Sequence, residues 1–295
     1  AEVGPLAKVG GLADVGAALP VALRRRGHDV RVVMPRYSSI NLVDVERVLP
    51  SGQFDVPMMG GSEKITVSQT SLKDGTSVYL LCNSRYFDRP NVYMEEDDLE
   101  RFLLFSIATA YLPFVLDWRP DIFHCHDWHA GLIPPLRAMM RLDAPADPLD
   151  ASLFTIHNIA YQGSFDEWFS ERAGLGAYLL AKSDPLGSKV MSLMGLGILH
   201  ADVISTVSIT HAGELLTPEY GAGLELVLQR RRTDLFGIVN GVDHSEFNPS
   251  TDIHIPARYD VDSLARKAEN KAALQSRFDL SSDPEVPLVG MVGRL

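Results

Sequence analysis

Apolar residues at helical spacing open the chain and lead directly into an extended apolar run. In residues 11–27 leucine, valine and alanine recur every three or four positions, and the segment ends in three arginines and Gly27. Basic residues in a last turn followed by glycine are typical of the end of a helix. Residues 28–35 then predict a buried strand. Since a glycine-rich loop, a helix and a strand make up most of a βαβ unit, we expect the natural protein to extend N-terminally by at least the first strand.

A hairpin and then an alternation of strands and helices follow. Residues 64–70 and 77–81 alternate in polarity and are joined by Asp74 and Gly75, which predicts a β-hairpin. Beyond it we expect helices near residues 97–116 and 130–141, and strands at residues 121–125, 153–156, 201–208 and 236–239. This order predicts an α/β fold: a Rossmann-like domain with a mainly parallel sheet, covered on both faces, plus the hairpin.

The alternation of strands and helices stops after residue 248. Residues 262–278 predict one charged amphipathic helix, and residues 286–293 predict a new buried strand. One strand cannot form a sheet of its own, so we expect it to begin a second Rossmann-like domain that is truncated here. The predicted organisation is an N-terminal domain over residues 1–248, a linker and helix over 249–285, and the start of the second domain over 286–295.

Composition and charge narrow the class of protein without identifying a function. The chain has 295 residues, 46% of them hydrophobic, as in a globular protein with its own core. Its two cysteines, Cys82 and Cys125, lie in apolar runs and are expected to be buried thiols. The longest apolar run, residues 102–116, is interrupted by polar residues and is too short to cross a bilayer. A net charge of −11 argues against extensive binding to nucleic acid or to an anionic membrane.

A glycine-rich loop with a lysine precedes the first predicted helix. Lys8 is followed by Gly10 and Gly11, immediately before the helical pattern begins. Adjacent glycines let backbone amides approach a ligand, and a helix N-terminus favours negative charge. The loop resembles a phosphate cradle, although it matches neither the Walker A nor the Gly-x-Gly-x-x-Gly pattern. A tight turn with a solvated lysine explains the same residues equally well.

Histidines gather where a predicted strand gives way to a helix. His124, His126, Asp127 and His129 lie at the end of the strand predicted at residues 121–125. In open α/β sheets, ligands bind at the carboxyl ends of the strands. Three histidines and an aspartate are compatible with a metal ion, but no second group of ligands follows at zinc-like spacing. We therefore favour a polar rim around a substrate hydroxyl and expect no metal.

Three later segments end in polar residues in the same way. His157 and Asn158 follow the strand at residues 153–156, and a polar group at such a strand end is typical of a functional site. Asn240 opens an Asn-Gly turn after the strand at residues 236–239, and this turn could be structural alone. Arg294 follows the last predicted strand, where it could face a diphosphate across an interdomain cleft or lie at the surface.

These motifs occur together, in the same order, in one family. The chain resembles the bacterial glycogen synthases and plant starch synthases, which have the two-domain GT-B architecture, along essentially its whole length. The first match is the Lys-x-Gly-Gly-Leu-Ala-Asp loop of residues 8–14. The further collinear matches are residues 86–90, 126–131, 157–163, 201–208, 220–221, 228–230, 238–243, 267–271 and 293–295. One such match could arise by chance, whereas the ordered set is specific.

The resemblance implies an activity. It implies a hexosyltransferase that moves glucose from ADP-glucose to the non-reducing end of an α-1,4-glucan, glycogen or starch, with retention at the anomeric carbon. It implies no cofactor and no required metal, and a location in the cytoplasm, or in the plastid stroma if the source is a plant or alga. The preference for ADP-glucose over UDP-glucose follows from the resemblance alone.

The resemblance also implies a set of site residues. Lys8 and the amides of Gly10 and Gly11 are expected to approach the phosphate and sugar of the donor, and His157 to contact the transferring glucose. A catalytic role is further implied for Asp127 in the cleft and for Arg294 on the leaving diphosphate. The remaining residues expected to bind substrate are Asp14, Asn158 and Asn240 in the cleft and Tyr93 at the acceptor. Holding the charge of the diphosphate is expected to supply most of the barrier lowering.

The chain departs from the family pattern in places, and two other functions remain open. Val9 stands where threonine is common, and Ile209 stands where proline usually follows Val-Ser. The family's second phosphate-binding lysine, a carboxylate near the donor sugar and the adenosine pocket would lie beyond residue 295, so we expect this fragment alone to be inactive. Another GT-B nucleotide-sugar enzyme would share the scaffold. A non-catalytic α-glucan-binding module would hold sugar on exposed aromatic rings.

Overall fold

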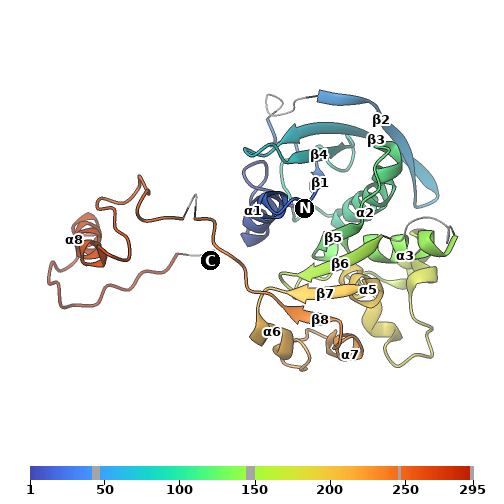
Figure 1. Ribbon diagram of the computed structural model, residues 1–295. Coiled ribbons are helices and arrows are strands. Elements are labelled where there is room, and N and C mark those ends of the chain that lie inside the picture. Colours follow the sequence, from blue (N-terminus) through green and yellow to red (C-terminus); the bar gives the residue numbers. More distant parts are fainter. Residues whose placement is uncertain (42–46, 144–149, 245–246, 293–295) are drawn as a thin grey trace. The chain divides into compact units, whose positions relative to one another are not determined.

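A computed structural model of the chain describes residues 1–41, 47–143, 150–244 and 247–292 and forms two compact units, Ala1–Asn240 and Gly241–Leu295 (Figure 1). The strands of the first unit are β1 (Arg31–Pro35), β2 (Arg47–Met58), β3 (Gly61–Ser71), β4 (Ser77–Cys82), β5 (Ile122–His126), β6 (Ala151–Ile156), β7 (Val203–Thr206) and β8 (Leu235–Gly237). Its α-helices are α1 (Gly11–Arg25), α2 (Asp98–Val115), α3 (Ile133–Asp143), α4 (Glu167–Arg172), α5 (Leu193–His200), α6 (Ile209–Glu214) and α7 (Glu225–Arg230), with 3-10 turns η2 (Trp128–Ala130), η3 (Leu175–Tyr178) and η4 (Gly187–Val190).

The strands form two four-stranded sheets. One sheet has the order β5-β6-β7-β8 and is parallel throughout, as the alternation of strands and helices predicts. The other has the order β1-β4-β3-β2, with β1 parallel to β4 and the remaining pairs antiparallel. The predicted α/β class with a mainly parallel sheet and a hairpin is confirmed. The division into two sheets and the long strand β2 were not predicted.

Local signals place the first helix and the hairpin where the sequence predicts them. Arg24 and Arg25 lie in the last turn of α1, and Gly27 adopts a positive φ of 93° just beyond it. In the hairpin between β3 and β4, Gly75 also has a positive φ, of 83°, and the Asp74 carboxylate accepts a hydrogen bond from the amide of Thr76. Both turns therefore depend on a glycine in a conformation that other residues adopt only with strain.

Helix α2 lies at the centre of the first unit. It contacts β1 and β2 as well as α3 and η2, and twelve of its residues are buried. A helix with this many buried residues belongs inside a core rather than at its edge. Within the described residues, no helix has the length and apolar character needed to cross a membrane.

In its described residues, the second unit contains little regular structure. It has the 3-10 turn η5 (Leu264–Arg266) and helix α8 (Lys267–Arg277), at the place where one amphipathic helix is predicted. The side chain of Asn270 joins this helix to Ala257 by two hydrogen bonds. Its Oδ1 atom accepts from the backbone amide of Ala257 at 2.9 Å, and its Nδ2 atom donates to the carbonyl of Ala257 at 2.8 Å. The domain boundary predicted after residue 248 stays a prediction.

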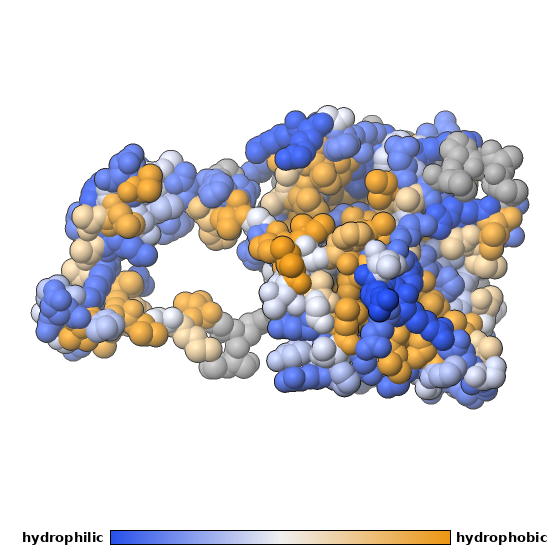
Figure 2. Space-filling view, turned by 60° about the horizontal axis from the view of Figure 1, so that its bottom comes forward, coloured by the Kyte–Doolittle hydropathy of each residue, from blue (hydrophilic) through white to orange (hydrophobic). Residues whose placement is uncertain are grey.

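Residues 286–292 form no strand in the described part of the chain, and the strand predicted at residues 286–293 as the start of a second domain stays a prediction. Val289 and Met291 are about nine-tenths exposed. An extended apolar segment becomes a strand only when a neighbour supplies hydrogen bonds and covers its side chains. No described residue pairs with this segment, and the surface view shows exposed apolar side chains on both units (Figure 2).

Candidate active site

The pairing of β5 with β6 brings together two of the polar segments singled out in the sequence. The strands run parallel, with Cys125 opposite Phe154 and His126 opposite Thr155. Residues that follow the two strand ends therefore become neighbours. The Asp127 Oδ1 atom accepts hydrogen bonds from the amides of His157 and Asn158, at 2.7 and 3.3 Å. Asp127 thus fixes the backbone at the carboxyl end of β6.

Asp127 itself has an unusual backbone conformation. Its φ is 55° and its ψ is −178°, a region occupied almost entirely by glycine. The side chain is 7% exposed, and burial raises the pKa of its carboxyl from 3.8 to about 6, although the two amide hydrogen bonds act in the opposite direction. Strained backbone of this kind is concentrated at functional sites, where the surrounding structure holds it in place.

A cluster of histidine rings lies beside Asp127. His126 Nδ1 is 3.0 Å from His157 Nε2, and the rings of His124 and His126 have centroids 4.1 Å apart. Burial lowers the pKa of His157 and of His124 to about 4, and it lowers that of His126 well below its usual value. These imidazoles are therefore neutral at pH 7, and they can offer hydrogen bonds but no positive charge.

The glycine loop is held from inside by a carboxylate that the sequence analysis missed. Glu2 is 5% exposed, and its Oε2 atom accepts hydrogen bonds from the amides of Val9 and Gly10 at 2.6 and 2.7 Å. Its Oε1 atom accepts a hydrogen bond of 2.6 Å from the Tyr93 hydroxyl. Glu2 therefore joins the loop to Tyr93 and already engages the amide of Gly10, whereas Gly11 is the first residue of α1.

Two predicted site residues, Lys8 in the loop and Asp14 in the first turn of α1, form an ion pair. Lys8 Nζ lies 2.5 Å from Asp14 Oδ1, and their side chains are 50% and 46% exposed. Ion pairs this exposed contribute about 0–1 kcal/mol to stability because water screens them. Loss of the Asp14 contact to an anionic ligand therefore costs little energy.

Tyr93 connects the loop to the histidine segment. Its ring stacks on that of His129, with centroids 4.8 Å apart, and burial is the first cause that raises the pKa of its hydroxyl, followed by the hydrogen bond to Glu2. His129 is 6% exposed and lies in η2, directly after Asp127 and Trp128. The predicted acceptor residue is thus placed near the histidine segment and in contact with the residue that holds the loop.

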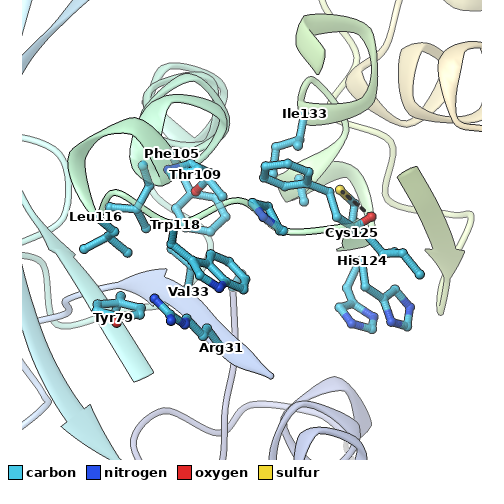
Figure 3. Close-up of a pocket in the computed structure, with 18 residues that line it drawn as sticks. Arg31, Val33, Tyr79, Phe105, Thr109, Leu116, Trp118, His124, Cys125 and Ile133 are labelled. Atoms are coloured by element: carbon cyan, nitrogen blue, oxygen red, sulfur yellow. Dashed lines mark hydrogen bonds between the residues drawn. The ribbon is translucent and has the colours of Figure 1, made fainter. Parts of the chain in front are cut away.

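A largely apolar cavity borders the histidine cluster. β1 and β5 each lie at an end of their sheets, and both strands line this cavity together with α2. Figure 3 shows Arg31 and Val33 on one side together with Thr109 of α2, and His124 and Cys125 on the other side. The Thr109 hydroxyl is buried and has no hydrogen-bond partner among the described residues. Ala1 also lines this cavity.

The remaining predicted residues are less closely tied to this cluster. Asn158 is exposed, and its side chain accepts a hydrogen bond from the amide of Ala160. Asn240 is exposed and follows β8, at the same edge of the parallel sheet as Asp127 and His157 but three strands away from β5. Arg294 lies outside the described residues. In the part of the chain that the structure describes, no group of three or more histidine, cysteine or acidic side chains is placed to hold a metal ion.

Two buried groups of the site escaped sequence reasoning. Glu2 is a lone carboxylate at the start of the chain, and nothing in its neighbours predicts that it turns inward. Thr155 and Ser205 lie on β6 and β7, and the Thr155 hydroxyl is 2.7 Å both from His124 Nε2 and from the Ser205 hydroxyl. Polar residues inside apolar strands are the one signal that could have identified this pair, because such groups are buried only when hydrogen-bonded.

The fold and the site together define a class of protein. A Rossmann-like α/β unit with buried polar groups at the carboxyl ends of its parallel strands, and a glycine loop at a helix N-terminus, is a ligand-binding domain. The family model described as the starch synthase catalytic domain matches residues 1–230. The chain belongs to this family.

Individual relatives agree with the family match. The chain is similar to a glycogen synthase of Moorella thermoacetica (41% identical over 296 residues) and to glycogen synthase 2 of Geobacter sulfurreducens (42% over 302 residues). All of the chain is covered in both alignments, which span 60% and 62% of the two relatives. It is also similar to a solved catalytic domain of starch synthase IV from Arabidopsis thaliana bound to ADP and acarbose. That comparison has 34% identity and a TM-score of 0.82, covering 96% of this chain and 58% of the other.

Proposed function

We propose that the protein to which this chain belongs transfers glucose from ADP-glucose to the non-reducing end of an α-1,4-glucan, with retention at the anomeric carbon. The observation that carries the proposal is the cluster in which Asp127 holds the backbone of His157 beside a hydrogen-bonded histidine ring. The chain spans about 60% of the length of the curated relatives, so the activity is proposed for the full-length protein. ADP in the similar Arabidopsis structure supports an adenine nucleotide donor.

On the donor side, Lys8 and the histidines have different roles because only the lysine is charged. The diphosphate of a nucleotide sugar is anionic, and the neutral histidines cannot balance it. Lys8 supplies a cation once it exchanges Asp14 for phosphate, and the first-turn amides of α1 that begin at Gly11 supply further donors. Arg294 is proposed to neutralise the leaving diphosphate as well. Stabilisation of that charge in the transition state lowers the barrier.

On the sugar side, neutral imidazole suits hydroxyl groups. His157 can donate a hydrogen bond to the transferring glucose or accept one from it. Because its ring is neutral, it does not attract the anionic diphosphate. Tyr93 is proposed to contact the acceptor glucan, and Asn158 and Asn240 to line the cleft. A location in the cytoplasm, or in the plastid stroma for a plant or algal source, is part of the same proposal, and no cofactor is required.

Two other functions have specific signatures. A different nucleotide-sugar enzyme of the same fold would transfer sugar from another donor, or to an acceptor other than a glucan. A non-catalytic glucan-binding module would bind maltooligosaccharides with an affinity that does not depend on Lys8. Trp168 and Tyr161 are 59% and 66% exposed, which is the feature that favours the binding module.

The test is a transfer assay with the full-length protein. Radiolabelled ADP-glucose and UDP-glucose are supplied separately with glycogen, and the washed polymer is digested with an exo-acting enzyme specific for α-1,4 linkages. The proposal predicts label from ADP-glucose in excess over UDP-glucose, and its release by the digestion. Polymer that stays unlabelled with both donors would overturn the proposal and favour the binding module.

A further inference from the structure

His157 is held at two points by two different residues. Its backbone amide donates to the Asp127 carboxylate at 2.7 Å, and its ring nitrogen Nε2 lies 3.0 Å from Nδ1 of His126. The first contact fixes where the residue sits, and the second is the one hydrogen bond to the ring among the described residues. The orientation of the ring therefore depends on His126, which is the last residue of β5.

The hydrogen bond between the rings also has a chemical consequence. A neutral imidazole carries a proton on one nitrogen and a lone pair on the other. When two neutral rings share a hydrogen bond, one nitrogen donates and the other accepts, so the tautomer of His126 sets the tautomer of His157. Since Nε2 of His157 is engaged by His126, Nδ1 is the nitrogen that remains to meet a ligand.

We propose that His126 is a positioning residue that fixes the ring orientation and the tautomer of His157, so that Nδ1 of His157 faces the transferring sugar. The sugar transfer itself rests on the proposed function, whereas the effect of His126 on His157 does not. His126 does not touch the reacting atoms in this arrangement. It acts through His157, in the way that a hydrogen-bonded partner orients a histidine ligand or base.

His124 provides a matched control within the same cluster. It lies on the same face of β5, and its ring centroid is 4.1 Å from that of His126. Its Nε2 atom, however, is 2.7 Å from the Thr155 hydroxyl, which in turn bonds Ser205. Replacing His124 disturbs the packing of the cluster but leaves the bond between His126 and His157 in place.

The experiment uses full-length protein labelled with 15N-histidine. The ring nitrogens of His157 are assigned with His157→Gln, and their 15N resonances distinguish a protonated from an unprotonated nitrogen. Three variants are compared: His126→Phe keeps a ring without nitrogen, His126→Asn keeps a hydrogen-bonding group at the δ position, and His124→Phe is the control. The kcat and KM for glucose transfer are measured on the same preparations.

We expect the wild type and His124→Phe to show a single tautomer of His157. His126→Phe should show exchange-averaged resonances of two tautomers and a kcat at least tenfold lower, with the KM for the donor changed less than threefold. His126→Asn should restore the single tautomer and recover most of the kcat. Two tautomers in the wild type, or a single one in His126→Phe, would overturn the inference. If His126→Phe does not fold, two tautomers in the wild type, or an unchanged single tautomer and kcat in His126→Leu, would still overturn the inference.

The readouts keep the two proposals apart. If the wild type transfers no glucose but shows the single tautomer that His126→Phe loses, the positioning role stands and the proposed function fails. If transfer is normal while the His157 resonances are the same in the wild type and in His126→Phe, the function stands and the positioning role fails.

Discussion

The backbone at Asp127 gives a quantitative test of strain in the site. At φ 55° and ψ −178° a residue with a side chain is strained, and conformations of this kind cost about 1–3 kcal/mol each. Glycine adopts them freely. The carboxylate offsets this cost by accepting hydrogen bonds from His157 and Asn158. A substitution by alanine therefore removes the hydrogen bonds and keeps the strain, whereas a substitution by glycine removes both.

The magnitudes follow from these two contributions. Asp127→Ala loses a charged acceptor of buried amides, worth about 1.5–3 kcal/mol, and keeps the strain. Asp127→Gly loses the same hydrogen bonds but releases about 1–3 kcal/mol of strain, less about 0.5–1 kcal/mol for the added flexibility of glycine in the unfolded chain. We expect Asp127→Gly to be more stable than Asp127→Ala by about 1 kcal/mol, the reverse of the usual order of these two residues.

The assay is urea unfolding of the full-length variants, followed by circular dichroism and compared at equal m-values. Both variants should also lose transfer activity, because the backbone of His157 is no longer held. If Asp127→Ala is as stable as Asp127→Gly, or more stable, the backbone is not strained and the reasoning is refuted.

Three further predictions concern packing, a buried ion pair and pH. Gly163 has a φ of 59°, and a Cβ there would lie 2.2 Å from the Trp128 ring, whereas Gly174 has a φ of 68° with open space around it. Gly163→Ala should therefore lower the free energy of unfolding by about 1–3 kcal/mol more than Gly174→Ala. Equal unfolding midpoints of the two variants in urea would contradict this clash. Arg137 donates to Asp150 at 2.8 and 3.0 Å, and the two side chains are 12% and 4% exposed. Arg137→Met should therefore lower the free energy of unfolding by about 3–5 kcal/mol, and the double variant with Asp150→Leu should lose less than Arg137→Met alone. A double-mutant cycle that shows no coupling would contradict this. His124 and His157 have a pKa near 4 when folded and near 6.5 when unfolded, so the unfolded state binds more protons between these values and stability should rise with pH from about 4 to 6.5. Asp127, with its pKa raised to about 6, acts in the opposite direction below pH 6, and His124→Phe should make the rise shallower; an unchanged slope in that variant would refute the assignment.

The parts of the site that were predictable follow from strand order. Because β5 and β6 are parallel neighbours, the polar residues after each strand meet at one edge, and Asp127 lies beside His157. The glycine loop before α1 was also predictable from its local pattern. Both inferences need only short-range sequence signals and the general geometry of an α/β sheet.

Other features depend on contacts that no local pattern encodes. Strand β2 carries Pro50, Gly52 and Pro57, residues that weaken a strand pattern, and it pairs with β3 through an irregular register between Val48 and Gln53. The inward turn of Glu2 depends on Tyr93, which is 91 residues away along the chain. The apolar run at residues 286–292 predicted a strand, but a strand also needs a partner, and the described residues supply none.

The most direct test of the account compares two histidines of the full-length protein. His157 lies in the site, whereas His28 is exposed beyond the end of α1. We predict that His157→Ala lowers kcat/KM for glucose transfer from ADP-glucose to glycogen at least tenfold, or about 1.4 kcal/mol of barrier, and that His28→Ala leaves it within twofold. A folded His157→Ala enzyme that transfers glucose as fast as the wild type would contradict the central claim that this cluster carries the reaction.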